Sequence, residues 1–168
     1  MSITRRNFLL TTIWGAVLAG IGLPGERLHA SQANIHKSSP IEIQENAMPL
    51  VNISILKGKS LEYIKAIADG INSAVIETMG FPDDDRYQII HELEPHCLQF
   101  QNRTEDRVMM HLIMRAGRSN KSKQAFYAKV VENLAADPGV DPANVLITIA
   151  ENHDIDWSFR DGIAQFVV

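Results

Sequence analysis

The sequence of 168 residues contains a single cysteine, Cys97. An intramolecular disulfide is therefore impossible, and a thiolate metal cluster is excluded as well. The six histidines show no spacing typical of metal ligands. His91 and His96 lie an odd number of residues apart, which on a strand points them to opposite faces. We therefore expect no metal site, and we expect no cofactor either.

Basic residues are fewer than acidic ones. Sixteen basic residues stand against 20 acidic ones, and the formal net charge is −4. No basic stripe with interleaved aromatic residues is present, so we expect no nucleic-acid partner. Hydrophobic residues make up 45% of the chain and charged residues 21%, which favours a globular protein over a disordered one. The length suits one compact domain rather than two large ones.

The first 30 residues have the pattern of an export signal. Arg5 and Arg6 precede an apolar run over residues 8–23. Residues 28–30 (Leu-His-Ala) then resemble a signal-peptide cleavage site of the A-x-A type. The apolar run is shorter than the roughly 20 residues that span a bilayer, so export is favoured over anchoring. The arginine pair followed by Asn-Phe-Leu resembles a twin-arginine signal. We therefore expect export to the periplasm by the twin-arginine translocase.

Residues 31–48 hold Ser, Gln, Asn, Lys and Pro with few large apolar groups. Such a composition favours a flexible arm in front of a folded domain. The domain itself is expected to span residues 49–168.

Two parts of this domain repeat with an offset of 59 residues. In each, a strand-like run leads to a glycine, a serine and an apolar helical period, and a second glycine precedes an Asp/Pro turn and another strand-like run. The serine is placed to cap the helix and the second glycine to end it. The equivalent pairs are Gly58/Gly117, Ser60/Ser119 and Gly80/Gly139. The pattern predicts β-α-β twice in succession.

The expected fold class is α+β, with a four-stranded mixed sheet and two helices on one face. The connecting segment 94–106 is expected to hold a short hairpin. Val51, Ile53 and Ile55 are assigned to the sheet face that no helix covers, and an apolar face of this kind favours a homo-oligomer. The expected strands are 50–55, 86–92, 108–114 and 145–151.

From Met48 onward the sequence resembles the tautomerase superfamily. The most similar branch has two repeats fused in one chain and includes malonate semialdehyde decarboxylase. The resemblance implies two β-α-β units related by a pseudo-twofold axis, assembled as a homotrimer. The matching stretches are 48–51 (Met-Pro-Leu-Val), 85–89 (Asp-Arg-Tyr-Gln-Ile), 103–107 (Arg-Thr-Glu-Asp-Arg), 115–119 (Arg-Ala-Gly-Arg-Ser), 156–159 (Asp-Trp-Ser-Phe) and 162–166 (Gly-Ile-Ala-Gln-Phe).

The resemblance also implies that Pro49 is a general base, through the free secondary amine of an N-terminal proline. A pseudo-twofold axis sets the first strands of the repeats antiparallel, which brings Pro49 close to Arg115 and Arg118. Their guanidinium groups suit the task of holding a substrate carboxylate and stabilising enolate charge. Desolvation and nearby cations would both lower the pKa of the amine toward neutrality.

By the motif match, Asp85 corresponds to the carboxylate that orients a water in the decarboxylase and hydratase branch. Trp157 and Phe159 are expected to wall the pocket. Each residue also has a purely structural interpretation: Pro49 at the start of an edge strand, the aspartate in an acidic turn, the tryptophan in a core or subunit contact. The joint occurrence of a proline, two arginines and an aspartate favours an active site.

The position of Pro49 leaves three interpretations open. Cleavage after Ala30 leaves residues 31–48 in front of it, and an amide nitrogen has no useful basicity. The first interpretation is a tautomerase or isomerase acting on small 2-oxo or enol carboxylates, and the second is a decarboxylase or hydratase of the same superfamily. The third is an exported, non-enzymatic protein in which Pro49 is acylated and the arginines bind an anion. A translation start at Met48 would give a cytoplasmic form with a free Pro49.

Overall fold

The computed structural model describes residues 49–167. The expected export signal at 1–30 and the expected arm at 31–48 lie outside the described residues. Between residues 49 and 167, no helix is both long and apolar enough to cross a membrane.

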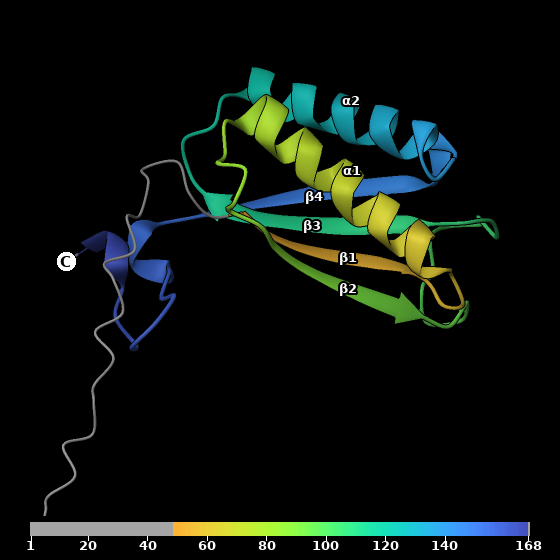
Figure 1. Ribbon diagram of the computed structural model, residues 1–168, viewed down its shortest axis with the longest axis horizontal. Coiled ribbons are helices and arrows are strands. Elements are labelled where there is room, and N and C mark those ends of the chain that lie inside the picture. The colour runs from red at the N-terminus through yellow and green to blue at the C-terminus, as the bar shows by residue number, and fades with distance from the viewer. Residues whose placement is uncertain (1–48, 168) are drawn as a thin grey trace, which may run out of the picture. The chain divides into compact units, whose positions relative to one another are not determined.

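Two β-α-β units follow one another and share one sheet (Figure 1). Strands pair in the order β2-β1-β3-β4, parallel within each unit and antiparallel between β1 and β3. Both helices lie on the same face of the sheet. This arrangement confirms the predicted fold. The elements are β1 Leu50–Leu56, α1 Leu61–Met79, β2 Tyr87–Leu93, β3 Val108–Arg115, α2 Asn120–Ala136 and β4 Val145–Asn152.

Both helices begin at the predicted serines. The Ser60 hydroxyl accepts a hydrogen bond from the backbone N–H of Tyr63, and the Ser119 hydroxyl accepts one from that of Ser122. Each bond satisfies a donor that the first helical turn would leave unpaired. The prediction for the first helix end is confirmed too, because Gly80 has φ +70° and its N–H donates to the carbonyl of Ile76.

The prediction for the second helix end is wrong by two residues. Helix α2 ends at Ala136, ahead of Gly139, and Asp137 takes the cap position. The reason lies in Pro138, which has no N–H to continue the helical hydrogen bonds. Gly139 closes the following turn instead, with φ +94° and its N–H donating to the carbonyl of Leu134.

The helix-covered face of the sheet carries the residues expected on the opposite face. Val51, Ile53 and Ile55 are at most 1% exposed and pack in one core with residues of both helices, such as Ile71 and Phe126. The prediction for these three was wrong because alternation along a strand defines two faces without saying which one a helix covers.

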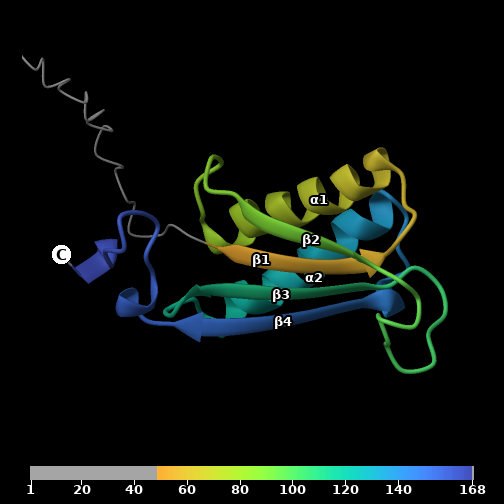
Figure 2. The ribbon, with the colours of Figure 1, turned by 90° about the horizontal axis from the view of Figure 1, so that it is seen from below.

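The other face has no helix over it within the described residues (Figure 2). Polar residues lie along the middle of this face and apolar ones around them. Tyr87 and Ile89 on edge strand β2 are 44% and 46% exposed. The strand register assigns to this face Leu50, Asn52, Ser54, Tyr87, Ile89, Met109, His111, Ile113, Leu146 and Thr148.

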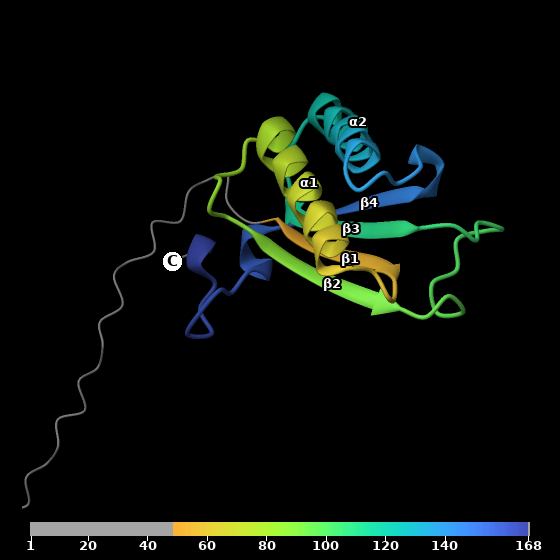
Figure 3. The same ribbon diagram turned by 45° about the vertical axis from the view of Figure 1, so that its right-hand side comes forward.

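Two irregular segments lie at opposite ends of the sheet (Figure 3). The first, residues 94–107, contains hydrogen-bonded turns and no strand, so the expected hairpin does not form there. Buried Arg107 closes this segment by donating to the backbone carbonyls of Arg103 and Pro95. The second, residues 153–167, is here called the C-terminal segment, and it contains a short antiparallel bridge between Arg160 and Ile163.

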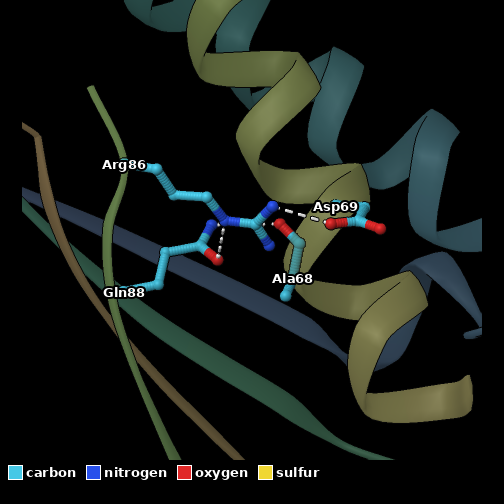
Figure 4. Close-up of polar contacts among 4 residues, drawn as sticks. All are labelled: Ala68, Asp69, Arg86 and Gln88. Carbon is cyan, nitrogen blue, oxygen red and sulfur yellow. Dashed lines mark hydrogen bonds and ion pairs between the residues drawn. The ribbon is translucent and has the colours of Figure 1, made fainter. Parts of the chain in front are cut away.

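Polar contacts fasten the start of β2 to helix α1 (Figure 4). The Arg86 guanidinium donates to Asp69 at 2.7 Å and to the side-chain oxygen of Gln88 at 3.0 Å. The Gln88 amide in turn donates to the carbonyl of Ala68 at 3.0 Å. Because neighbouring residues of a strand face opposite ways, Tyr87 then points toward the face without a helix.

Candidate active site

The sheet brings the expected site residues to one of its ends. Leu50 pairs with Ile113 across the antiparallel β1 and β3, so Pro49 precedes one strand where Arg115 ends the other. Pro49 is buried. Strand β2 runs parallel to β1 and starts at the same end, which places Asp85 near that end as well. This register follows from the pseudo-twofold arrangement of the two repeats.

Two residues of the C-terminal segment contact the Arg115 side chain. Its Nε and Nη2 both donate to one oxygen of Asp154, each over 2.8 Å. The guanidinium carbon also lies 4.1 Å from the ring centroid of Phe166, within the range of a cation–π contact. The Arg115 side chain is only 19% exposed, so its charge is partly shielded from water.

Arg118 lies close enough to Arg115 for their charges to interact. Burial lowers the pKa of Arg118, the positive charge of Arg115 lowers it further, and the charge of Glu151 acts in the opposite direction. The Arg118 guanidinium carbon lies 4.3 Å from the ring centroid of Phe81. Two partly buried cations that repel one another favour the binding of an anion between or beside them.

Tyr87, which the sequence analysis did not single out, lies at the same end of the sheet. It stands opposite Leu50, the residue after Pro49, in the pairing of β1 and β2. Burial raises the pKa of Tyr87, and the negative charges of Asp85 and Asp84 raise it further. The phenol therefore stays protonated at neutral pH and can donate a hydrogen bond. The available signal was its place in the stretch Asp-Arg-Tyr-Gln, next to the aspartate.

Trp157 and Phe159 form a stack with ring centroids 5.6 Å apart and planes inclined by 17°. Phe166, a further aromatic residue that the sequence reasoning passed over, meets Phe159 edge to face. The group packs on Leu50 and Ile113, next to the start of β1. The two expected wall residues thus lie at the same end of the sheet as Pro49.

The stack of Trp157 and Phe159 is attached to strand β4. The indole Nε1 of Trp157 donates to the side-chain oxygen of Asn152 over 2.7 Å. Next to this bond lies an open cavity of about 440 Å³. Its lining residues are Ala116, Asn152, His153, Asp154, Ile155 and Val167. No group of three or more metal-ligating side chains occurs in the part of the chain that the structure describes.

Comparison with protein families matches residues 49–103 and residues 85–160, each to a family described as tautomerase enzyme. Two similar proteins are the probable tautomerases YrdN and YusQ of Bacillus subtilis. YrdN is 33% identical over 127 residues, which cover 71% of this chain and 97% of YrdN. YusQ is 31% identical over 127 residues, which cover 71% of this chain and 99% of YusQ.

Similar solved structures include two of malonate semialdehyde decarboxylase. The FG41 enzyme inhibited by 3-bromopropiolate is 35% identical with a TM-score of 0.64, covering 70% of this chain and 94% of that one. A second structure of malonate semialdehyde decarboxylase, studied for its decarboxylase and hydratase activities, is 31% identical and has the same TM-score. The match covers 70% of this chain and 95% of that one. A fused 4-OT that forms a symmetric trimer is 19% identical with a TM-score of 0.61, which concerns the fold alone.

The lengths of YrdN and YusQ indicate that a domain such as residues 49–168 can fold by itself. YrdN and YusQ are matched over nearly their whole length by 71% of this chain. YrdN and YusQ are therefore about as long as the domain alone. Both repeats also share one buried core within residues 49–167. We therefore expect the domain to fold without residues 1–48.

Proposed function

This chain belongs to the tautomerase superfamily, and from that premise we propose that its domain is a tautomerase acting on small 2-oxo or enol carboxylates. The observation that carries the proposal is the placement of buried Pro49 at the sheet end where Arg115 terminates β3 and Arg118 lies nearby. A base and an anion clamp are the two parts that proton transfer next to a carbonyl requires.

In the proposed reaction, the amine of Pro49 takes a proton from one atom of the substrate and returns it to another. Burial and the nearby arginine charges disfavour an ammonium group and bring the pKa of the amine down from about 8. Arg115 and Arg118 hold the substrate carboxylate and stabilise the negative charge of the enolate. Trp157 and Phe159 provide the apolar wall that excludes water.

We also propose that the full-length chain is exported to the periplasm by the twin-arginine translocase, guided by residues 1–30. Cleavage after Ala30 leaves Pro49 acylated, and this form binds anions without catalysing proton transfer. Catalysis then depends on a start at Met48, because removal of that methionine exposes the proline amine. The catalytic form is in that case cytoplasmic.

A second candidate function is decarboxylation or hydration by the same site. Asp85 supports it, since its negative charge acts on Tyr87 at the end of the sheet where the arginines lie. A carboxylate there is suited to orient a water molecule toward the substrate. The similarity to malonate semialdehyde decarboxylase, at 35% and 31% identity, supports it further.

We propose a homotrimer as the working assembly. Support comes from the helix-free sheet face, which exposes Tyr87 and Ile89, and from trimeric structural neighbours. Copies that meet through this face would cover its apolar residues.

The direct test is an activity assay of the domain beginning at Pro49, with its N-terminus verified by mass. Phenylenolpyruvate serves as the enol substrate and malonate semialdehyde as the substrate for decarboxylation. We expect ketonisation of the enol well above the uncatalysed rate. A folded domain that leaves every small 2-oxo or enol carboxylate unchanged would refute the proposed activity.

A further inference from the structure

Hydrogen bonds within the C-terminal segment hold it in shape, independently of its contact with Arg115. The side chain of Gln165 accepts a hydrogen bond from the backbone N–H of Phe159 at 2.9 Å and donates one to the carbonyl of Arg160 at 2.8 Å. Near the start of the segment, the carboxylate of Asp156 accepts a bond from the backbone N–H of His153 at 2.8 Å. The segment is thus a closed loop with internal support.

Asp154 reaches Arg115 from this loop. One carboxylate oxygen accepts from both Nε and Nη2 of the arginine, 39 residues earlier in the chain. Phe166 of the same loop contacts the guanidinium group with its ring. A planar guanidinium that has one edge bonded and one face covered is limited to a narrow range of orientations.

We propose that Asp154 is a positioning residue, which orients the Arg115 guanidinium for the substrate carboxylate. This inference rests on the proposed carboxylate-binding role of Arg115. Asp154 contacts the arginine, and in the proposed role it acts on the substrate through that arginine. Its loss should therefore act through Arg115, both by weakening carboxylate binding and by misaligning the bound substrate.

Three variants of the domain beginning at Pro49 separate the contributions. Asp154→Ala removes the acceptor, and we expect kcat/KM to fall by about 10²-fold, the scale of loss from a misplaced binding group. Asp154→Asn keeps an acceptor oxygen but loses the charge, and we expect a fall on the order of 10-fold. Asp161→Asn is the control, because it makes the same charge change on the same loop. The Asp161 side chain is 74% exposed, and its carboxylate lies 3.8 Å from Nε of Arg160, too far for a hydrogen bond. We expect this variant to leave the kinetics unchanged.

A structural role and a positioning role differ in KM. If Asp154→Ala only unfolds a fraction of the molecules, the apparent kcat falls with the fraction that stays folded, while KM stays constant. A positioning role raises KM as well. The dissociation constant of benzoate, an unreactive carboxylate, gives the same information without turnover. Trp157 is the only tryptophan in the domain, since the other is Trp14, so its fluorescence can report this binding.

A double-mutant cycle tests whether Asp154 acts through the arginine. In an Arg115→Ala background, Asp154→Ala should have no further effect on benzoate affinity. Additive losses in the two variants would overturn the inference. So would tighter benzoate binding in Asp154→Ala, because that result would make the aspartate a competitor of the substrate.

Failure of this inference is distinguishable from failure of the proposed function. A wild-type domain that binds benzoate without any turnover refutes the tautomerase activity, while weaker binding in Asp154→Ala still supports the positioning role. A wild-type domain that is active, with Asp154→Ala identical to it, overturns the positioning role alone. A wild-type domain without affinity for carboxylates overturns both.

Discussion

Lys59 and Arg118 occupy equivalent places in the two repeats, since each directly precedes the serine that caps the following helix. Their surroundings differ. Lys59 forms an ion pair with Asp106 and lies 5.0 Å from the ring centroid of Tyr63. At that end Val108 stands where the repeat offset would require a second proline. The pseudo-twofold axis therefore relates two ends of the sheet that carry cations, and the proposed chemistry belongs to only one of them.

The environment of Tyr63 should make stability fall in alkaline solution. Burial, together with the charge and hydrogen bond of Asp106, raises the pKa of Tyr63 from 10.0 to about 12. The unfolded chain loses this proton first, so the contribution of the protonated phenol is complete below about pH 10 and is lost between about pH 10 and 12. Urea unfolding at pH 9 and pH 11 should show a larger loss for the wild type than for Tyr63→Phe.

The control for this measurement is Tyr127→Phe, at an exposed tyrosine of helix α2. It should lose as much stability at pH 11 as the wild type. If Tyr63→Phe also loses as much, the phenol does not contribute to the alkaline transition.

Arg115→Ala should cripple turnover of an enol carboxylate without unfolding the domain. The guanidinium is proposed to bind the carboxylate and stabilise the enolate, and the loss of one such donor costs on the order of 10²–10³ in rate. Steady-state kinetics on phenylenolpyruvate measures the effect, and circular dichroism checks the fold. Lys57→Ala is the control, because exposed Lys57 pairs with Glu94 at the opposite end of the sheet. Unchanged kinetics in Arg115→Ala would remove this arginine from the site.

Asp85→Asn should separate the two candidate reactions. Ketonisation requires the base and the arginine clamp and should be spared, whereas decarboxylation or hydration requires a carboxylate to orient water and should be abolished. Asp83→Asn, in the same acidic turn, serves as the control. Both activities are assayed on one preparation. Equal loss of both in Asp85→Asn would assign the aspartate to a step that the two reactions share.

The fold could be predicted from the sequence because its signals are local and occur twice. A capping serine, a period of apolar residues and a strand-like run each depend on neighbours a few positions away. The exception at Gly139 is local as well: Pro138 ends the helix first. The proximity of Pro49 to Arg115 was also predictable, since antiparallel pairing of the first strands follows from the repeat.

The rest of the site depends on contacts between distant parts of the chain. Asp154 meets Arg115 only after the C-terminal segment has folded back to the end of the sheet, and no periodicity reports such a contact. The assignment of Val51, Ile53 and Ile55 failed for another reason. Their strand has Asn52 and Ser54 on the alternate face, and comparing the two sets would have favoured the more apolar set for the core.

The assembly should be visible in light scattering on the purified domain, which we expect to report about three chains. Ile89→Lys places a charge on the helix-free face, where Ile89 is 46% exposed. Burying that charge between copies would be costly, so this variant should dissociate to monomers. Leu61→Lys, at a residue of helix α1 that is 69% exposed, should leave the assembly intact. A monodisperse wild-type monomer would contradict the trimer.

The N-terminus of the domain should decide whether the protein is catalytic at all. A form beginning at Met48-Pro49 exposes the proline amine once the initiator methionine is removed. A form beginning at Ser31, as cleavage after Ala30 would leave it, keeps 18 residues in front of Pro49. Its Pro49 nitrogen is an amide whose lone pair is delocalised, and no rearrangement elsewhere in the structure restores its basicity.

We therefore predict that the Pro49 form is an active tautomerase and that the Ser31 form is inactive or nearly so. The difference in rate should be at least the roughly 10²–10⁴ that a positioned general base contributes. Both forms are assayed side by side on phenylenolpyruvate, after intact mass has confirmed each N-terminus. Binding of benzoate to both forms controls for the arginine pocket, which should be present in each. Equal activity would mean that Pro49 is not the base, and a different group would then have to carry the proton within the same fold.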